Sequence, residues 1–215
     1  RLIMPAYYGM VKCLDDNIGK ILEALRKNNQ IKNTIIVFTS DHGDLCGEHG
    51  RLNKGVPYEG SARIPFVIYC PGKIPAGRVV NEALSCVDFV PTLFSLTDDK
   101  LPKGVEGRDA SGLFQNKSTK WNDIAFLRST SNSQPWLTVV TDRYKLIYSS
   151  LGKPWLYDLK NDPEELHNTF NLSKSKSTIQ KLTQHLMKYA KDSNDPYIKN
   201  KKIKSQILQA LDETE

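Results

Sequence analysis

The chain has 215 residues, of which 39% are hydrophobic and 25% are charged. These proportions exclude wholesale disorder, and no apolar run approaches the roughly 18–20 residues that cross a membrane. The formal net charge of +6 comes largely from lysines in the last 42 residues. We interpret them as a solvated helix face and tail and not as a nucleic-acid site, because no aromatic residues alternate with them at the spacing that base stacking needs.

The first half of the sequence predicts alternating helices and strands. Apolar residues recur at steps of three and four over 11–25, which predicts an amphipathic helix. Two short apolar runs rich in β-branched residues, 34–39 and 64–70, predict strands buried on both faces, as in a parallel sheet. A helix is expected over 88–96, with Asp88 as its cap. This order of elements predicts an α/β fold.

The pattern changes near residue 117, where short apolar segments separated by turns predict a small antiparallel meander. These segments are 124–127, 136–140, 144–148 and 155–157. A closing helix is expected over 178–191, and the Lys-rich stretch after it predicts a frayed terminal helix. We therefore divide the chain into a first domain over 1–118, an antiparallel sheet plus helix over 119–195, and a charged terminal segment over 196–215.

The residues that suggest chemistry follow the first predicted strand, in the segment TSDHGDLCGEHG over 39–50. Loops at the carboxyl ends of strands are where open α/β sheets bind ligands. Asp41 and His42 can offer a carboxylate oxygen and an imidazole nitrogen to one cation, and Gly43 is expected to let the chain turn sharply so that both face it. On its own, Asp-His-Gly also fits a helix cap beside a polar neighbour, with no metal.

This segment belongs to a set of motifs in a fixed order. They stand at 7–11, 14–19, 41–43, 47–50, 54, 58–59, 62–65, 87–93, 156–159, 162–164 and 168. As an ordered set between residues 5 and 170, they resemble the formylglycine-dependent sulfatase family. Within the set, Glu59 and Arg63 are expected to form a buried structural pair near the second strand.

The resemblance implies an alkaline-phosphatase-like α/β fold, with part of a mixed sheet flanked by helices and then a small antiparallel C-terminal subdomain. It implies hydrolysis of sulfate esters by a formylglycine, made from Cys or Ser in a C-x-P-x-R-type motif, with a divalent cation, usually Ca²⁺. Asp41 and His42 would be metal ligands and Lys54 would contact the sulfate. His49 would protonate the leaving oxygen as a catalytic residue, contact the sugar, or hydrogen-bond only within its own loop.

Two departures from the family pattern bear on activity. No Cys or Ser in this chain opens a C-x-P-x-R-type motif, and the family's remaining metal carboxylates are expected upstream of Arg1. The resemblance therefore predicts a sulfatase fragment that is inactive alone, with its formylglycine in a missing N-terminal part. Metal binding is expected to be weak, because two ligands leave a hard cation largely hydrated.

Two other functions stay open. The first is a metal-dependent phosphodiesterase or phosphonate hydrolase of the same superfold, since an Asp-His pair suits zinc or manganese at least as well as calcium. The second is a non-catalytic binding relative. The expected substrate is a sulfated small molecule or glycan, and the resemblance favours a periplasmic, secreted or lysosomal location. Nothing in the sequence assigns an oligomeric state.

Overall fold

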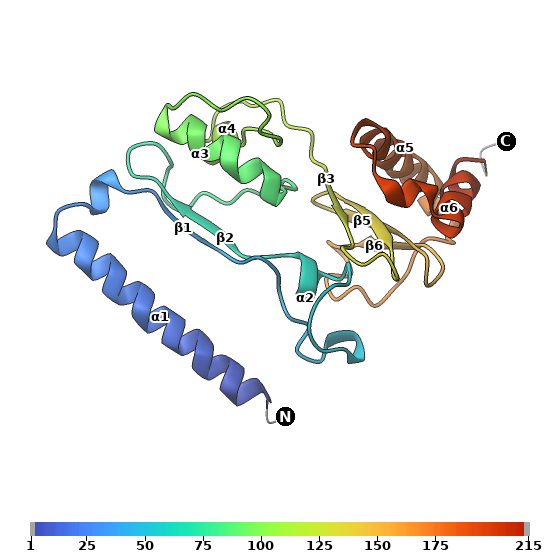
Figure 1. Ribbon diagram of the computed structural model, residues 1–215, viewed down its shortest axis with the longest axis horizontal. Coiled ribbons are helices and arrows are strands. Elements are labelled where there is room, and N and C mark those ends of the chain that lie inside the picture. The colour runs from blue at the N-terminus through green and yellow to red at the C-terminus, as the bar shows by residue number, and fades with distance from the viewer. Residues whose placement is uncertain (1–2, 213–215) are drawn as a thin grey trace.

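A computed structural model describes residues 3–212 of the chain. Figure 1 shows a long N-terminal helix and a two-stranded sheet in the first part of the chain. In the second part, helices α5 and α6 pack on a four-stranded sheet. None of the helices within residues 3–212 is long and apolar enough to cross a membrane.

Helix α1, Ile3–Lys27, confirms the predicted helix and extends it at both ends. Its last turn carries Arg26 and Lys27, which suit the negative end of the helix dipole. Leu14 and Ile21 on its apolar face are 61% and 60% exposed. The helix runs apart from the rest of the described chain (Figure 1), so its amphipathic pattern predicted the element but not a buried position.

Strands β1, Ile36–Thr39, and β2, Phe66–Tyr69, form the two-stranded sheet. They are antiparallel, in the register Ile36↔Tyr69, and side chains such as Val67 are exposed. The prediction of parallel strands buried on both faces is therefore wrong for the described chain. An apolar run shows that a strand suits burial, but the direction of pairing depends on the long loop between the strands.

Three helices accompany this sheet: α2, Glu59–Ala62; α3, Phe89–Thr97; and α4, Ser111–Phe114. The predicted helix at Asp88 is confirmed as α3, but the carboxylate of Asp88 makes no capping hydrogen bond to that helix. It accepts instead from the Ser85 N–H at 3.0 Å and from the Arg108 guanidinium at 2.9 Å. Asp88 thus ties the start of α3 to a later segment.

The predicted meander is confirmed as a sheet in the order β3-β4-β5-β6, in which every neighbouring pair is antiparallel. The strands are β3, Ala125–Arg128; β4, Trp136–Val140; β5, Tyr144–Ser149; and β6, Trp155–Asp158. Short segments rich in β-branched and aromatic residues, separated by short turns, specify such a sheet locally, which explains why it was predictable.

Helices α5, Lys176–Asp192, and α6, Lys201–Asp212, cover this sheet. Leu186 of α5 and Ile203 and Ile207 of α6 are buried with Leu146 of β5 in one apolar core. The expected terminal helix is confirmed as α6, but the expected fraying is wrong, because α6 buries its apolar face while its lysines face outward. The domain boundaries at 118 and 195 stay predictions.

Short 3-10 turns occur within residues 3–212 at Ile31–Asn33, Glu48–Gly50, Cys86–Asp88, Ser173–Ser175 and Pro196–Lys199.

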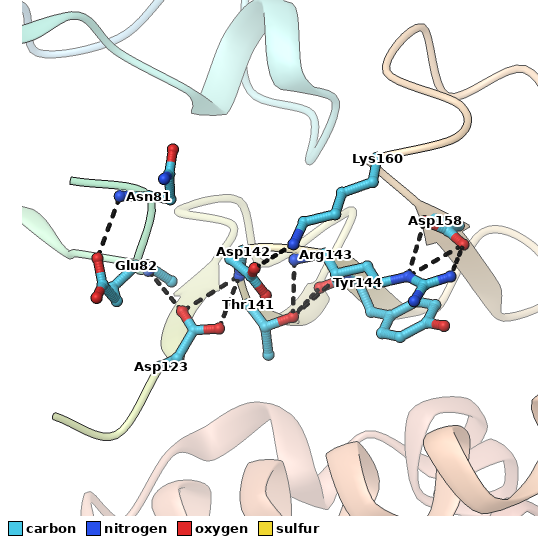
Figure 2. Close-up of polar contacts among 10 residues, drawn as sticks. Asn81, Glu82, Asp123, Thr141, Asp142, Arg143, Tyr144, Asp158 and Lys160 are labelled. Carbon is cyan, nitrogen blue, oxygen red and sulfur yellow. Dashed lines mark hydrogen bonds and ion pairs between the residues drawn. The ribbon is translucent and has the colours of Figure 1, made fainter. Parts of the chain in front are cut away.

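The two halves of the chain are tied together by Asp123, as Figure 2 shows. Its carboxylate accepts from the backbone N–H of Ala83 at 2.7 Å and of Asp142, in the β4–β5 turn, at 3.1 Å. Burial raises the pKa of Asp123.

Candidate functional site

The loop between β1 and α2 carries all four predicted site residues and is folded back on itself. Leu45 is buried within it and donates its N–H to the Asn53 carbonyl oxygen at 2.9 Å. Asp44 accepts from the Cys46 N–H at 2.8 Å. This hydrogen bond and, more weakly, the nearby Lys54 ammonium lower the pKa of Asp44. The loop is therefore an ordered structure with an internal apolar anchor.

Gly43 is required by a close backbone approach. Its N–H donates to the Ser61 carbonyl oxygen at 2.9 Å, and a Cβ at this position would lie 2.1 Å from the carbonyl oxygen of Gly60. Its φ lies outside the left-handed region that favours glycine. The expected reason for this glycine, a sharp turn, is therefore wrong: glycine fits because the loop touches α2 here.

Asp41 and His42 lie together at the end of β1. The Asp41 carboxylate accepts from the His42 backbone N–H at 3.0 Å, which lowers the pKa of Asp41. His42 Nδ1 lies 2.8 Å from the Gly43 carbonyl oxygen. Because a carbonyl oxygen only accepts, Nδ1 must carry the proton in that contact. In the neutral imidazole, Nε2 then keeps a lone pair.

That lone pair fits a shared cation. His42 Nε2 lies 3.3 Å from Oδ2 of Asp41, and two acceptors so close need a proton or a cation between them. Two ligand atoms that each lie about 2.3 Å from one ion, with an angle of about 90° between them at the ion, are about 3.3 Å apart. The Asp41 side chain is 84% exposed and that of His42 39% exposed, so an ion can reach the pair.

The pair alone is an incomplete metal centre. Among residues 3–212 there is no group of three or more His, Cys, Asp or Glu side chains arranged to hold an ion. Zinc, manganese and calcium sites all take more than two ligands. The arrangement accommodates a cation with two protein ligands from this chain, and the assignment of Asp41 and His42 stays a prediction.

His49 stacks on Tyr58, with ring centroids 3.8 Å apart and an angle of 12° between the rings. Its φ of 51° is unusual for a residue with a side chain. An open cleft of about 330 Å³ lies beside it. The cleft is lined by Glu48, His49, Glu59, Gly60, Arg63 and residues 163–166. Asp41, His42 and Lys54 do not line it, and Lys54 is exposed on the loop.

Glu59 was expected to form a buried pair with Arg63, but its close partner is another residue. Arg63 is 78% exposed and 3.7 Å from the Glu59 carboxylate. The close partner of Glu59 is Lys145, which is 1% exposed and also pairs with Glu165 at 2.9 Å. Sequence reasoning missed Lys145 and the stacking role of Tyr58. The available signal was a lysine inside the apolar strand β5.

Comparison with known proteins places these features in a family. A family model described as N-sulphoglucosamine sulphohydrolase, C-terminal, matches residues 47–192, more than half of the chain. The chain belongs to the sulfatase family. A second family model, of proteins of unknown function, matches residues 3–75. The predicted family and the predicted C-terminal portion are both confirmed.

Several curated relatives are sulfatases. The chain is 35% identical over 202 residues to an arylsulfatase of Clostridium perfringens, which covers 92% of this chain and 42% of that protein. It is 31% identical over 206 residues to an N-acetylglucosamine-6-O-sulfatase of Bacteroides thetaiotaomicron, covering 90% and 37%. It is also 31% identical over 216 residues to arylsulfatase K of Gallus gallus, covering 94% and 40%. The chain thus spans about two-fifths of the length of these relatives.

Solved structures confirm the predicted α/β fold class. A protein solved in complex with its substrate D-glucosamine-2-N,6-O-disulfate superimposes with a TM-score of 0.76 at 30% identity. That match covers 86% of this chain and 40% of the other. A phosphonate monoester hydrolase of Agrobacterium radiobacter superimposes with a TM-score of 0.70 at 28% identity, covering 97% and 42%. The fold is therefore shared by enzymes acting on different esters.

Proposed function

We propose that this chain forms the cation-binding and sulfate-binding part of a sulfatase that hydrolyses sulfate esters. The observation that carries the proposal is the Asp41–His42 pair, whose donor atoms lie 3.3 Å apart at the end of β1. The pair stands in a chain that belongs to the sulfatase family. The whole enzyme's reaction goes beyond this chain, which spans about two-fifths of its relatives.

Each site residue takes a chemical role in this proposal. Asp41 and His42 hold a divalent cation, for which Ca²⁺ is our choice, and Gly43 keeps the His42 ring turned so that Nε2 is available. The exposed ammonium of Lys54 binds a non-bridging sulfate oxygen. His49 is the candidate proton donor to the leaving oxygen, since imidazole titrates near neutral pH.

The nucleophile is outside these residues. No Cys or Ser of the 215 opens a C-x-P-x-R-type motif, so the proposed formylglycine belongs to sequence beyond this chain. When present, the cation and formylglycine supply charge stabilisation and the attacking oxygen. We expect this chain alone not to turn over sulfate esters.

The proposed substrate is a sulfated sugar. Support comes from relatives named for sugar sulfates, such as the N-acetylglucosamine-6-O-sulfatase of Bacteroides thetaiotaomicron, and from the neighbour solved with a disulfated glucosamine. The second candidate is phosphonate ester hydrolysis, which the likeness to phosphonate monoester hydrolase favours. Both chemistries place negative charge on oxygens that a cation and an ammonium stabilise.

The test is turnover by the gene product translated from its initiator codon, with 4-nitrophenyl sulfate and 4-nitrophenyl phenylphosphonate as parallel substrates. We expect a higher kcat/KM for the sulfate, and a loss of 100-fold or more, on the order of that seen for single electrostatic donors, in Asp41→Asn and Lys54→Ala. Lys32→Ala, which changes another exposed lysine, is the matched control. Faster phosphonate turnover, or full activity in Asp41→Asn, would contradict the proposal.

A further inference from the structure

A buried lysine lies where the antiparallel sheet meets the loop that carries His49. Lys145, in β5, is 1% exposed. Its ammonium pairs with the carboxylates of Glu59 and Glu165 and donates to the Pro57 carbonyl oxygen at 2.9 Å. An ammonium has three N–H donors, and each of these has an acceptor here. A buried cation is tolerated only with such complete pairing.

The acceptors fix a short stretch of backbone. Pro57 and Glu59 flank Tyr58 directly, and Glu165 belongs to the loop after β6. The other oxygen of Glu165 accepts from the Glu59 N–H at 2.6 Å. Glu165 has a φ of 53°, a conformation that is rare for a residue with a side chain and persists only where its surroundings hold it.

Tyr58 passes this constraint to His49. The two rings stack at 3.8 Å, and Trp155 of β6 lies on Tyr58 at 6.1 Å. The His49 loop has its own backbone hydrogen bonds, such as Arg51 N–H to Glu48 O at 2.9 Å. Those bonds fix the turn, while the imidazole lies against the face of the tyrosine ring.

We propose that the Lys145–Glu59–Glu165 cluster positions the imidazole of His49, acting through Tyr58. Lys145 is a positioning residue, because its donors are all taken by protein groups. The meaning of this for catalysis rests on the proposed function. The contact itself is measured without turnover, so failure of the sulfatase assay and failure of this inference are distinguishable.

The test uses the imidazole Cε1–Hε1 NMR signals of the full chain. There are four histidines, so the His49 signal is assigned from a His49→Gln variant. Stacking on Tyr58 places this proton in the ring current and shifts its signal upfield. The variant Lys145→Met/Glu165→Gln removes one positive and one negative charge, which keeps the net charge of the cluster. We expect its His49 signal to move downfield to the position of an unstacked histidine.

Two further variants frame that result. Tyr58→Leu is expected to cause the same downfield shift, and Lys160→Met, which removes an exposed lysine paired with Asp142, is expected to leave His49 unmoved. An unshifted His49 in the double variant, with the His185 signal of α5 in place, would overturn the inference. If the double variant does not fold, the single variant Glu165→Gln is used instead. We expect the same downfield shift of the His49 signal in it, and an unmoved His49 signal in this variant overturns the proposal.

Discussion

Replacing Gly43 by alanine tests whether the close contact between the site loop and α2 is a real constraint. The added Cβ would lie 2.1 Å from the Gly60 carbonyl oxygen and 3.0 Å from its carbon, and both are backbone atoms that cannot rotate away. The loop must therefore retreat by roughly 1 Å, which breaks the hydrogen bond from Gly43 to Ser61. Losing that bond costs about 1 kcal/mol, and overpacking adds about 1–3 kcal/mol.

We therefore expect Gly43→Ala to lower the free energy of unfolding by about 2–4 kcal/mol. For a chain of this size, that corresponds to a fall in Tm of roughly 4–16 °C. Thermal unfolding followed by circular dichroism at 222 nm measures it. The matched control is Gly19→Ala in α1, where nothing lies within 4 Å of an added Cβ and helix propensity favours alanine. Equal Tm values for the two variants would refute the steric argument.

Two other predictions concern single side chains. The Arg143 guanidinium, 2.9 Å from Asp158, lowers the pKa of that carboxyl (Figure 2). Because the folded pKa is lowered, the ion pair stabilises the fold at pH values above the unfolded pKa of about 3.9. That stabilisation is lost as the pH falls through the folded pKa. Urea unfolding should thus show Arg143→Gln to be less stable than the unsubstituted chain at pH 7, with the difference shrinking as the pH falls below the unfolded value; a constant difference would contradict this. At His49, where φ is 51°, His49→Gly should be more stable than His49→Ala by about 0.5–1 kcal/mol, and equal urea midpoints would argue against strain there.

The second half of the fold was predictable because its information is local. The strands of the meander are short segments rich in β-branched and aromatic residues, and short turns connect consecutive strands, so pairing follows chain order. The apolar faces of α5 and α6 are also encoded locally, by the spacing of apolar residues along each helix. In α6, the many lysines made the burial of Ile203 and Ile207 hard to predict. Lysines on the outer face of α6 are compatible with a fully packed inner face.

The first half was less predictable because its contacts are long-range. An apolar run gives the position of β1 but not its antiparallel pairing with β2 across a long loop. In the candidate site, adjacent residues such as Asp41 and His42 were accessible from sequence. The need for glycine at Gly43 depends on Gly60, and the burial of Lys145 depends on Glu59 and Glu165, none of which is a sequence neighbour.

The cation site is tested most directly by adding Mn²⁺ to this chain and following its histidine NMR signals, since a bound paramagnetic ion broadens nearby protons. We predict that the His42 signal disappears first, that Asp41→Asn removes this selectivity, and that Ca²⁺ in the millimolar range, on the order of weak protein sites, restores the signal. The matched control is Asp99→Asn, which changes an exposed aspartate after α3. Broadening of His167 or His185 before His42, or unchanged His42 broadening in Asp41→Asn, would contradict the account.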